Sequence, residues 1–428
     1  MTPHIINLHP VLNKLYGPDE EDIRNGINRF KKLQDKFKIK FGEPGEHFFS
    51  TPGRTEISGN HTDHNHGRVM AASINLDSIG VAALRDDMTV VLWSEGYAKP
   101  FKVNLTQRDV QPEDNGTTEG LIRGIAAGFK NNDYQIGGFN ACISSSVLPG
   151  SGLSSSASIE VLIGTIFSAL FNQNRVSAQR LAQIGQYAEN QYFGKPCGLM
   201  DQMACAVGGI IAIDFKDPEN PVVEQVDFDF NKQGYRLLVV DTGGSHVDLT
   251  PDYAAVPREM KAVARELGKT VCRELSMSML IPRISELREK LGDRAVLRAI
   301  HFLEENDRVL SQVTALTNGD FEQFIELAGK SGDSSFKWLQ NVYSVQNVTE
   351  QGIPLALALT EKYISEIGAG ACRIHGGGFA GTILVLLPEQ AVDKYMDRMN
   401  SVIGENRVLN LQIRPYGTIY LNHFLKSI

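Results

Sequence analysis

The glycine- and serine-rich run at residues 148–158 constrains the fold of this chain more than any other feature of its sequence. It reads LPGSGLSSSAS and leads into residues 156–172, which are apolar on almost every face of a helix and so predict a buried helix. Gly150 and Gly152 let a ligand approach the backbone, and the serines place N–H and hydroxyl groups at the helix N-terminus, where an anion is favoured. We expect a phosphate-binding loop, although the run lacks the Gly-Lys-Ser/Thr of a Walker A loop and an ordinary serine-capped helix is the alternative.

The composition is that of an ordinary globular protein. The 428 residues are 42% hydrophobic and 21% charged, which excludes disordered and fibrous classes. A net charge of −8 makes the chain a poor partner for nucleic acid or an anionic membrane, so we expect neither. The five cysteines match no zinc spacing, and the first 14 residues lack a signal pattern, so we expect a reduced, cytoplasmic protein.

Helical and strand patterns are mixed along the chain, which predicts an α/β (α+β) fold with two lobes. We place the boundary near the polar, turn-rich segment 216–234, giving an N-terminal lobe at 1–230 and a C-terminal lobe at 231–428. The helices expected are 19–38, 156–172, 176–192, 253–274, 283–291, 294–304, 307–316, 320–330 and 353–367. The strands expected lie within 66–104, 209–215, 235–241, 371–387 and 407–425.

A second polar segment, residues 51–67, reads TPGRTEISGNHTDHNHG. Its proline and glycines predict a loop between a helix and a sheet. A loop alone does not explain Arg54 after a tight turn, nor the imidazoles and carboxylate at His61, Asp63, His64 and His66. A metal site is one alternative, but no distant cluster completes a ligand set. A polar-ligand site and a plain loop stay equally open.

Two later segments carry further signals. Residues 374–382 read IHGGGFAGT, and three consecutive glycines in a strand-rich region favour close approach of the backbone to a nucleotide or to another chain segment. In residues 189–203, Glu189 ends a predicted helix and Asp201 follows a turn, so the two carboxylates can face one site. The alternative for both acids is a solvated surface.

Taken in this order, the segments resemble the GHMP family of small-molecule kinases, and within it the galactokinases. Residues 52–63 are similar to the Pro-Gly-Arg … Gly-x-His-Thr-Asp signature, and residues 149–157 to the Pro-x-Gly-x-Gly-Leu-Ser-Ser-Ser-Ala loop with its proline one place later. Residues 189–202 resemble the Glu-Asn … Cys-Gly-x-Met-Asp-Gln stretch, residues 376–381 the C-terminal glycine loop, and residues 343–345 a Tyr-x-Val segment.

The resemblance implies a two-lobed fold that holds ATP and a sugar in the cleft between lobes, and transfer of the γ-phosphoryl group to the 1-hydroxyl of galactose. It implies Asp201 as the catalytic base with Arg54 beside it, and Ser156 and Glu189 as Mg²⁺ ligands. It further implies sugar contacts from Asn60, His61, Asp63 and Tyr253. The phosphate loop that it implies comprises Gly150, Ser151, Gly152, Leu153, Ser154, Ser155 and Ser156. We expect a monomer or weak homo-oligomer with a small-molecule sugar substrate.

The chain departs from the family pattern in the sugar signature. Asn60 stands where glutamate is usual, His64 where tyrosine is usual, and Glu56 where asparagine is usual; Ala380 replaces a glycine of the last loop. An amide at position 60 can accept a hydrogen bond but lacks the charge, so weaker galactose binding or a shifted preference is expected. The alternatives are a kinase for an N-acetylhexosamine, a uronic acid or a pentose, a non-catalytic sensor of sugar and ATP, and a kinase for a non-sugar alcohol.

Overall fold

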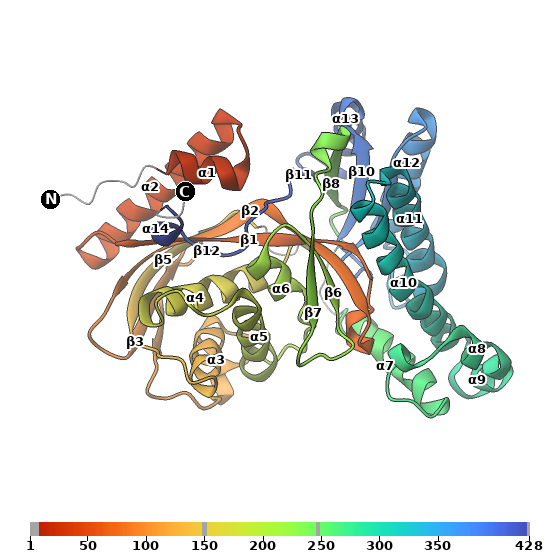
Figure 1. The fold of residues 1–428 in the computed structure, drawn as a ribbon, viewed down its shortest axis with the longest axis horizontal. Helices are drawn as coiled ribbons and strands as arrows, with labels where there is room; N and C mark the ends of the chain where they lie inside the picture. Colours follow the sequence, from red (N-terminus) through yellow and green to blue (C-terminus); the bar gives the residue numbers. More distant parts are fainter. Residues whose placement is uncertain (1–7, 148–151, 245–248, 426–428) are drawn as a thin grey trace.

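The computed structural model describes residues 8–147, 152–244 and 249–425, and within these ranges the strands form two sheets (Figure 1). The larger sheet has the strand order β12-β1-β2-β5-β3-β4, with β6 paired to β2 and β7 to β6. Its strands are β1 (His47–Ser58), β2 (Arg68–Leu84), β3 (Thr89–Ser94), β4 (Phe101–Asn104), β5 (Phe139–Ser145), β6 (Ile210–Asp214), β7 (Val222–Val226) and β12 (Ile419–Tyr420). The smaller, antiparallel sheet has the order β11-β8-β10-β9 and comprises β8 (Tyr235–Asp241), β9 (Ala371–His375), β10 (Thr382–Pro388) and β11 (Val408–Leu411).

Helices cover both faces of the larger sheet (Figure 1). Two lie on one face, where Phe30 and Phe37 pack against strand residues such as Val81, and the others lie on the opposite face. The first group is α1 (His9–Tyr16) and α2 (Glu20–Phe41), and the second is α3 (Thr118–Asn131), α4 (Ser155–Phe171), α5 (Ala178–Ala188) and α6 (Met200–Val207). Sequence explains α2 well, because the Asp19 side chain caps its first turn and its apolar residues recur at helical spacing.

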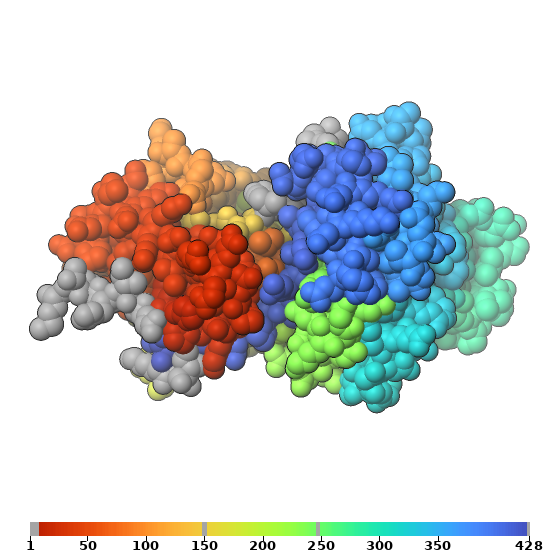
Figure 2. Space-filling view, turned by 90° about the horizontal axis from the view of Figure 1, so that it is seen from above, coloured from red at the N-terminus to blue at the C-terminus, as the bar shows by residue number. Residues whose placement is uncertain are grey.

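The smaller sheet is also covered on both faces. One face packs against α12 and α13, and the other packs against α10, α11 and the end of the larger sheet. The helices of this part are α7 (Thr250–Glu266), α8 (Met277–Leu280), α9 (Ile284–Leu291), α10 (Asp293–Thr317), α11 (Phe321–Ser334), α12 (Gly352–Ile367) and α13 (Val392–Ile403). Seen from above, the two parts form two masses joined by a waist (Figure 2).

The mixed fold with two lobes is confirmed. The expected boundary between 230 and 231 stays a prediction; it falls between β7 and β8, which belong to different sheets. The chain does not keep to one lobe after that point, since β12 pairs with β1 and the short helix α14 (Leu421–Phe424) follows it.

The buried helix expected at 156–172 is confirmed as α4, with residues such as Val161, Ile163 and Phe167 fully buried. Three other expectations were wrong. Residues 51–58 are not a loop but the last eight residues of β1. Residues 294–304 and 307–316 lie in the single helix α10, and the segment 216–234 contains β7. Strand β1 was missed because its polar residues are buried between the lobes, and burial of that kind leaves no apolar alternation in the sequence.

Among the described residues, no helix has the length and apolar character that crossing a bilayer requires.

Candidate active site

An ion pair between Arg54 and Asp201 joins β1 to α6. Arg54 Nε donates to Asp201 Oδ1 and Nη2 donates to Oδ2, both at 2.7 Å. A register shift in β1 between Pro52 and Arg54 turns the arginine toward this site, and Asp201 lies in the first turn of α6. The Arg54 side chain is 7% exposed and the Asp201 side chain 33% exposed. The carboxylate is therefore held by a buried guanidinium while part of it stays open to a ligand.

The expected phosphate loop contacts this ion pair. Ser154 Oγ donates to Asp201 Oδ2, and Arg54 Nη1 donates to the carbonyl of Gly152. The arginine, the aspartate and the serine run thus lie together, as the resemblance implies. Burial by itself would raise the pKa of Asp201, but the charge of Arg54 and the hydrogen bonds from Arg54 and Ser154 lower it below the usual aspartate value. Asp201 is consequently ionised at neutral pH.

The described part of the expected phosphate loop, residues 152–156, is anchored in the core. Leu153 is fully buried and its carbonyl accepts from Arg54 N at 3.1 Å. Ser154 has φ 59°, after which Ser155 begins α4. Ser155 is half-buried and Ser156 exposed, so N–H and hydroxyl groups at this helix N-terminus are accessible. Two of the expected phosphate-loop residues, Gly150 and Ser151, lie outside the described residues.

Ser156 and Glu189, the expected magnesium ligands, are neighbours. Ser156 Oγ lies 3.4 Å from Glu189 Oε1, which also receives the ammonium of Lys195 at 3.1 Å. Glu189 Oε2 accepts from Gln202 Nε2 at 2.9 Å, and the glutamate is 3% exposed. A hydroxyl and a carboxylate are hard oxygen donors of the kind Mg²⁺ takes, and Lys195 demonstrates that a cation is held at this carboxylate. Within the described ranges, no group of three or more His, Cys, Asp or Glu side chains is arranged to bind a metal.

The expected sugar residues His61, Asp63 and Tyr253 converge from two lobes. His61, with φ 59°, donates from Nε2 to Gly377 O at 2.8 Å, and the Tyr253 hydroxyl donates to Gly378 O at 2.9 Å. The Asp63 carboxylate lies against Gly198, three residues before Asp201, so closely that a Cβ at position 198 would overlap it. Desolvation and the neighbouring His64 lower the pKa of His61 to about 4, which keeps the ring neutral at neutral pH.

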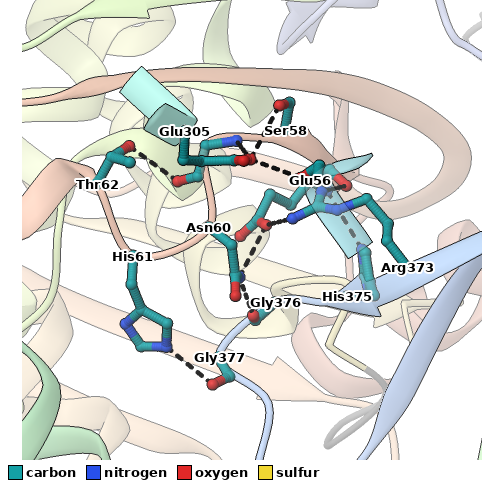
Figure 3. Close-up of polar contacts among 12 residues, drawn as sticks. Glu56, Ser58, Asn60, His61, Thr62, Glu305, Arg373, His375, Gly376 and Gly377 are labelled. Atoms are coloured by element: carbon teal, nitrogen blue, oxygen red, sulfur yellow. Dashed lines mark hydrogen bonds and ion pairs between the residues drawn. The ribbon is translucent and has the colours of Figure 1, made fainter. Parts of the chain in front are cut away.

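Asn60 is arranged differently from the other expected sugar residues. It is 1% exposed, and its Nδ2 donates to Glu56 Oε1 at 2.9 Å and to Gly376 O at 2.6 Å (Figure 3). Its Oδ1 accepts from Asn341 Nδ2 at 2.7 Å. Protein groups thus occupy both ends of the amide. A direct sugar contact from Asn60 stays a prediction, and these contacts do not support it.

Sequence reasoning missed His375, which links the lobes. Its Nε2 accepts from the Glu56 N–H at 3.2 Å, so in the neutral ring the proton is on Nδ1, which lies 2.9 Å from Thr382 Oγ1. Burial and the nearby Arg54 and Arg373 lower the pKa of His375 well below the usual histidine value. Its position beside three glycines was the one available signal, since its partners on β1, Thr55 and Glu56, are about 320 residues away in the sequence.

A cavity of about 350 Å³ lies at the outer side of the glycine loop rather than at Asp201. Its lining includes Thr242, Ser344, Glu350, Phe379 and Ala380, but neither Arg54 nor Asp201. The arginine, aspartate and serine loop contact one another directly.

Comparison with known proteins agrees with this geometry. Residues 120–209 match the GHMP kinases N terminal domain, and residues 35–84 match the galactokinase galactose-binding signature. A galactokinase from Enterococcus faecalis is 30% identical over 371 residues, which are 85% of this chain and 92% of the relative. The chain belongs to the galactokinase family. Family membership makes it an ATP-dependent sugar kinase.

Solved structures extend the comparison to the fold. The crystal structure of Lactococcus lactis galactokinase complexed with galactose is similar with a TM-score of 0.78 and 26% identity, covering 91% of this chain and 99% of that one. The mevalonate kinase of Methanococcus jannaschii is similar with a TM-score of 0.57 and 16% identity, covering 86% of this chain and 99% of that one. The second likeness concerns the fold alone.

Proposed function

We propose that this sugar kinase transfers the γ-phosphoryl group of ATP to the 1-hydroxyl of galactose. The observation that carries the proposal is the ion pair of Arg54 and Asp201, lying against Ser154 at the N-terminus of α4. Galactose is supported by the match of residues 35–84 to the galactose-binding signature and by relatives named galactokinase.

Asp201 is the proposed catalytic base. Its lowered pKa keeps the carboxylate ionised, and its partly exposed oxygens can accept the proton of a sugar hydroxyl as the new P–O bond forms. Arg54 holds the carboxylate through two hydrogen bonds and adds positive charge beside the reacting oxygen. Phosphoryl transfer asks a protein for positioning and charge stabilisation, and this pair can provide both.

The proposed phosphate site is the run from Gly150 to Ser156 at the start of α4, where N–H groups and the helix dipole favour the phosphates of ATP. We propose that Ser156 and Glu189 hold Mg²⁺, which when bound neutralises phosphate charge. Gln202 donates to Glu189 and so keeps this carboxylate turned toward Ser156. No cofactor besides ATP and Mg²⁺ is needed for the reaction.

The proposed sugar contacts are His61, Asp63 and Tyr253. A neutral imidazole, a carboxylate and a phenol offer both donors and acceptors, as the hydroxyl groups of a sugar require. Asp63 contacts Gly198, and Gly198 is three residues before Asp201 in the chain. A sugar held by Asp63 therefore lies near the proposed base.

A kinase for a different sugar is the second candidate. The observation that favours it is position 60, where an amide that is bound to protein groups stands in place of the expected glutamate.

The experiment that tests the proposal is a panel of sugars assayed by ADP release with purified protein, ATP and Mg²⁺. Galactose giving the highest kcat/KM supports the proposal. Preference for an N-acetylhexosamine, a uronic acid or a pentose supports the second candidate. Binding of ATP and sugar without turnover of any sugar rejects both.

A further inference from the structure

The glycine loop, residues 376–381, presents the three consecutive carbonyls of residues 376–378 to side chains around the proposed sugar site. Gly376 O accepts from Asn60 at 2.6 Å, and the next two carbonyls accept from His61 at 2.8 Å and Tyr253 at 2.9 Å. His61 and Tyr253 are proposed sugar contacts, whereas Asn60 is buried among protein groups. The conformation of this loop therefore determines where both sugar contacts lie.

Four buried polar side chains form a hydrogen-bonded group that reaches the glycine loop through two of them, Asn60 and Asn341. We call the group the clasp: Glu56, Asn60, Asn341 and Arg373 (Glu56, Asn60 and Arg373 are labelled in Figure 3). Each is at most 3% exposed. Arg373 Nη2 donates to Glu56 Oε1 at 2.8 Å, and Asn60 Nδ2 donates to the same oxygen at 2.9 Å. Asn341 Nδ2 donates to Asn60 Oδ1 at 2.7 Å and to Gly377 O at 3.1 Å.

The loop lies directly against Asn341. Phe379 N donates to Asn341 O at 2.5 Å, and a Cβ at Gly378 would overlap the same carbonyl. Gly378 also has φ 81°, a conformation that L side chains rarely adopt. Close contact with Asn341 of the clasp thus explains Gly378, whereas a Cβ at Gly377 would overlap the ring of Tyr253.

We propose that the clasp positions the glycine loop, and through it His61 and Tyr253, for the sugar. Asn60 acts in this arrangement as a positioning residue that does not touch the substrate. The inference rests on the proposed function in one respect only, the assignment of His61 and Tyr253 as sugar contacts.

The charge balance of the clasp couples positions 56 and 60, so that the side chain at one position determines which side chain fits at the other. One carboxylate faces one guanidinium, and the Asn60 amide supplies the donors that Glu56 and Gly376 O require. A second carboxylate at position 60 would meet Glu56 at hydrogen-bond distance without a second cation. The two positions are also those at which the acid and amide of the family pattern are exchanged, and here the two exchanged side chains bond to each other.

The test is a double-mutant cycle with the near-isosteric changes Glu56→Gln and Asn60→Asp. We expect Asn60→Asp to raise the KM for sugar about tenfold or more, since two buried acceptors lose their donors, while the KM for ATP changes less than about twofold. Glu56→Gln alone keeps an acceptor for Arg373 and should have a smaller effect. The double variant restores one carboxylate to one guanidinium, because the negative charge added at position 60 is removed from position 56. Its sugar KM should therefore be at least about threefold lower than that of Asn60→Asp.

A third variant, Asn341→Ala, tests the clasp at a residue outside the galactose-binding signature. The proposal predicts the same rise in the sugar KM, because both Asn60 and Gly377 O lose a donor. The control is Asn347→Asp, which adds the same negative charge as Asn60→Asp but at an exposed position. It should leave the KM values for sugar and for ATP unchanged. An unchanged sugar KM in Asn341→Ala, or equal sugar KM values in Asn60→Asp and the double variant, would show that the clasp does not position the sugar contacts and would overturn the proposal.

Melting temperatures keep this test separate from the proposed function. Coupling within the clasp predicts that the double variant melts above Asn60→Asp whether or not any sugar is phosphorylated. If the wild-type chain phosphorylates no sugar, the proposed function fails. The clasp is then tested by the melting temperatures of the double variant and Asn60→Asp, and by sugar binding measured in calorimetry. A double variant that melts at or below Asn60→Asp overturns the clasp.

Discussion

At the scale of single residues, the site depends on how a few charged groups are held. Arg54 is almost completely buried, and such a cation is stable in the interior only with an anion and with acceptors for its remaining N–H groups. Asp201 and the Gly152 carbonyl supply these. The pair therefore fixes the phosphate loop and the proposed base relative to each other before any ligand binds.

Replacing Asp201 with alanine tests the proposed base. We expect Asp201→Ala to lower kcat about 10²–10⁴-fold, the usual contribution of a positioned general base, with ATP binding nearly unchanged. Single-turnover kinetics and calorimetry measure the two quantities. Asp86→Ala, at an exposed acid, is the control. Retention of more than a small fraction of activity by Asp201→Ala would show that another group accepts the proton.

Replacing Glu189 with glutamine tests the proposed magnesium ligand. Loss of a charged contact of ~1.5–3 kcal/mol should raise the Mg²⁺ concentration that gives half-maximal rate by about 10–100-fold. A magnesium titration of the initial rate measures it, with Glu219→Gln at an exposed position as the control. An unchanged titration would remove Glu189 from the metal site.

At the scale of elements, the site forms where loops from distant parts of the sequence meet. The start of α4 was predicted from its serines and apolar residues, because both signals are local. The path of residues 51–58 was not, because β1 is a strand with buried polar side chains whose partners lie on α10 and β9. Local pattern therefore predicted the helix start at which we propose that phosphate binds, and only the resemblance linked it to residues 51–67.

The contact of Gly198 with Asp63 leads to a prediction at this scale. A methyl group at position 198 must displace the Asp63 carboxylate, so Gly198→Ala should raise the KM for sugar about tenfold or more and leave the KM for ATP unchanged. Steady-state kinetics with each substrate varied measures both values. Gly329→Ala is a matched control, because its Cβ would meet no atom within 4 Å. Equal sugar KM values in the two variants would separate Asp63 from sugar binding.

At the scale of the whole molecule, the two lobes meet through buried polar groups. Glu305 of α10 accepts from Ser58 Oγ at 3.2 Å and from Gly59 N at 3.0 Å. Burial alone would raise the pKa of Glu305, but Arg308 and its other partners lower it to about 2. Pairs of this kind, about 250 residues apart, could not be read from one sequence, since each member resembles an ordinary surface residue until the chain is folded.

The buried His375 predicts how stability depends on pH. Its folded pKa lies well below the usual ~6.5, so as pH falls below ~6.5 the unfolded chain takes up a proton that the folded chain does not. Stability should therefore decrease toward acid pH, by at most about 1.4 kcal/mol per pH unit for this group. His375→Gln removes the titrating ring and keeps an amide oxygen that can accept from Glu56 N. Between pH 7.5 and pH 5.5, which lie ~1 unit on either side of the usual histidine pKa, this variant should lose less melting temperature than the wild type. The control is His9→Gln, at a partly exposed histidine, which should lose as much melting temperature over this pH range as the wild type. An equal loss in His375→Gln and the wild type would contradict the prediction, because it would mean that the ring is charged in the folded state.

The most direct test of the central claim is phosphorus NMR of the product formed from ATP and galactose by the wild-type chain and by Asp201→Ala. We predict that the wild type forms galactose 1-phosphate and that the variant forms almost none over the same time. A phosphate on any other hydroxyl, or equal product from both proteins, would contradict the account.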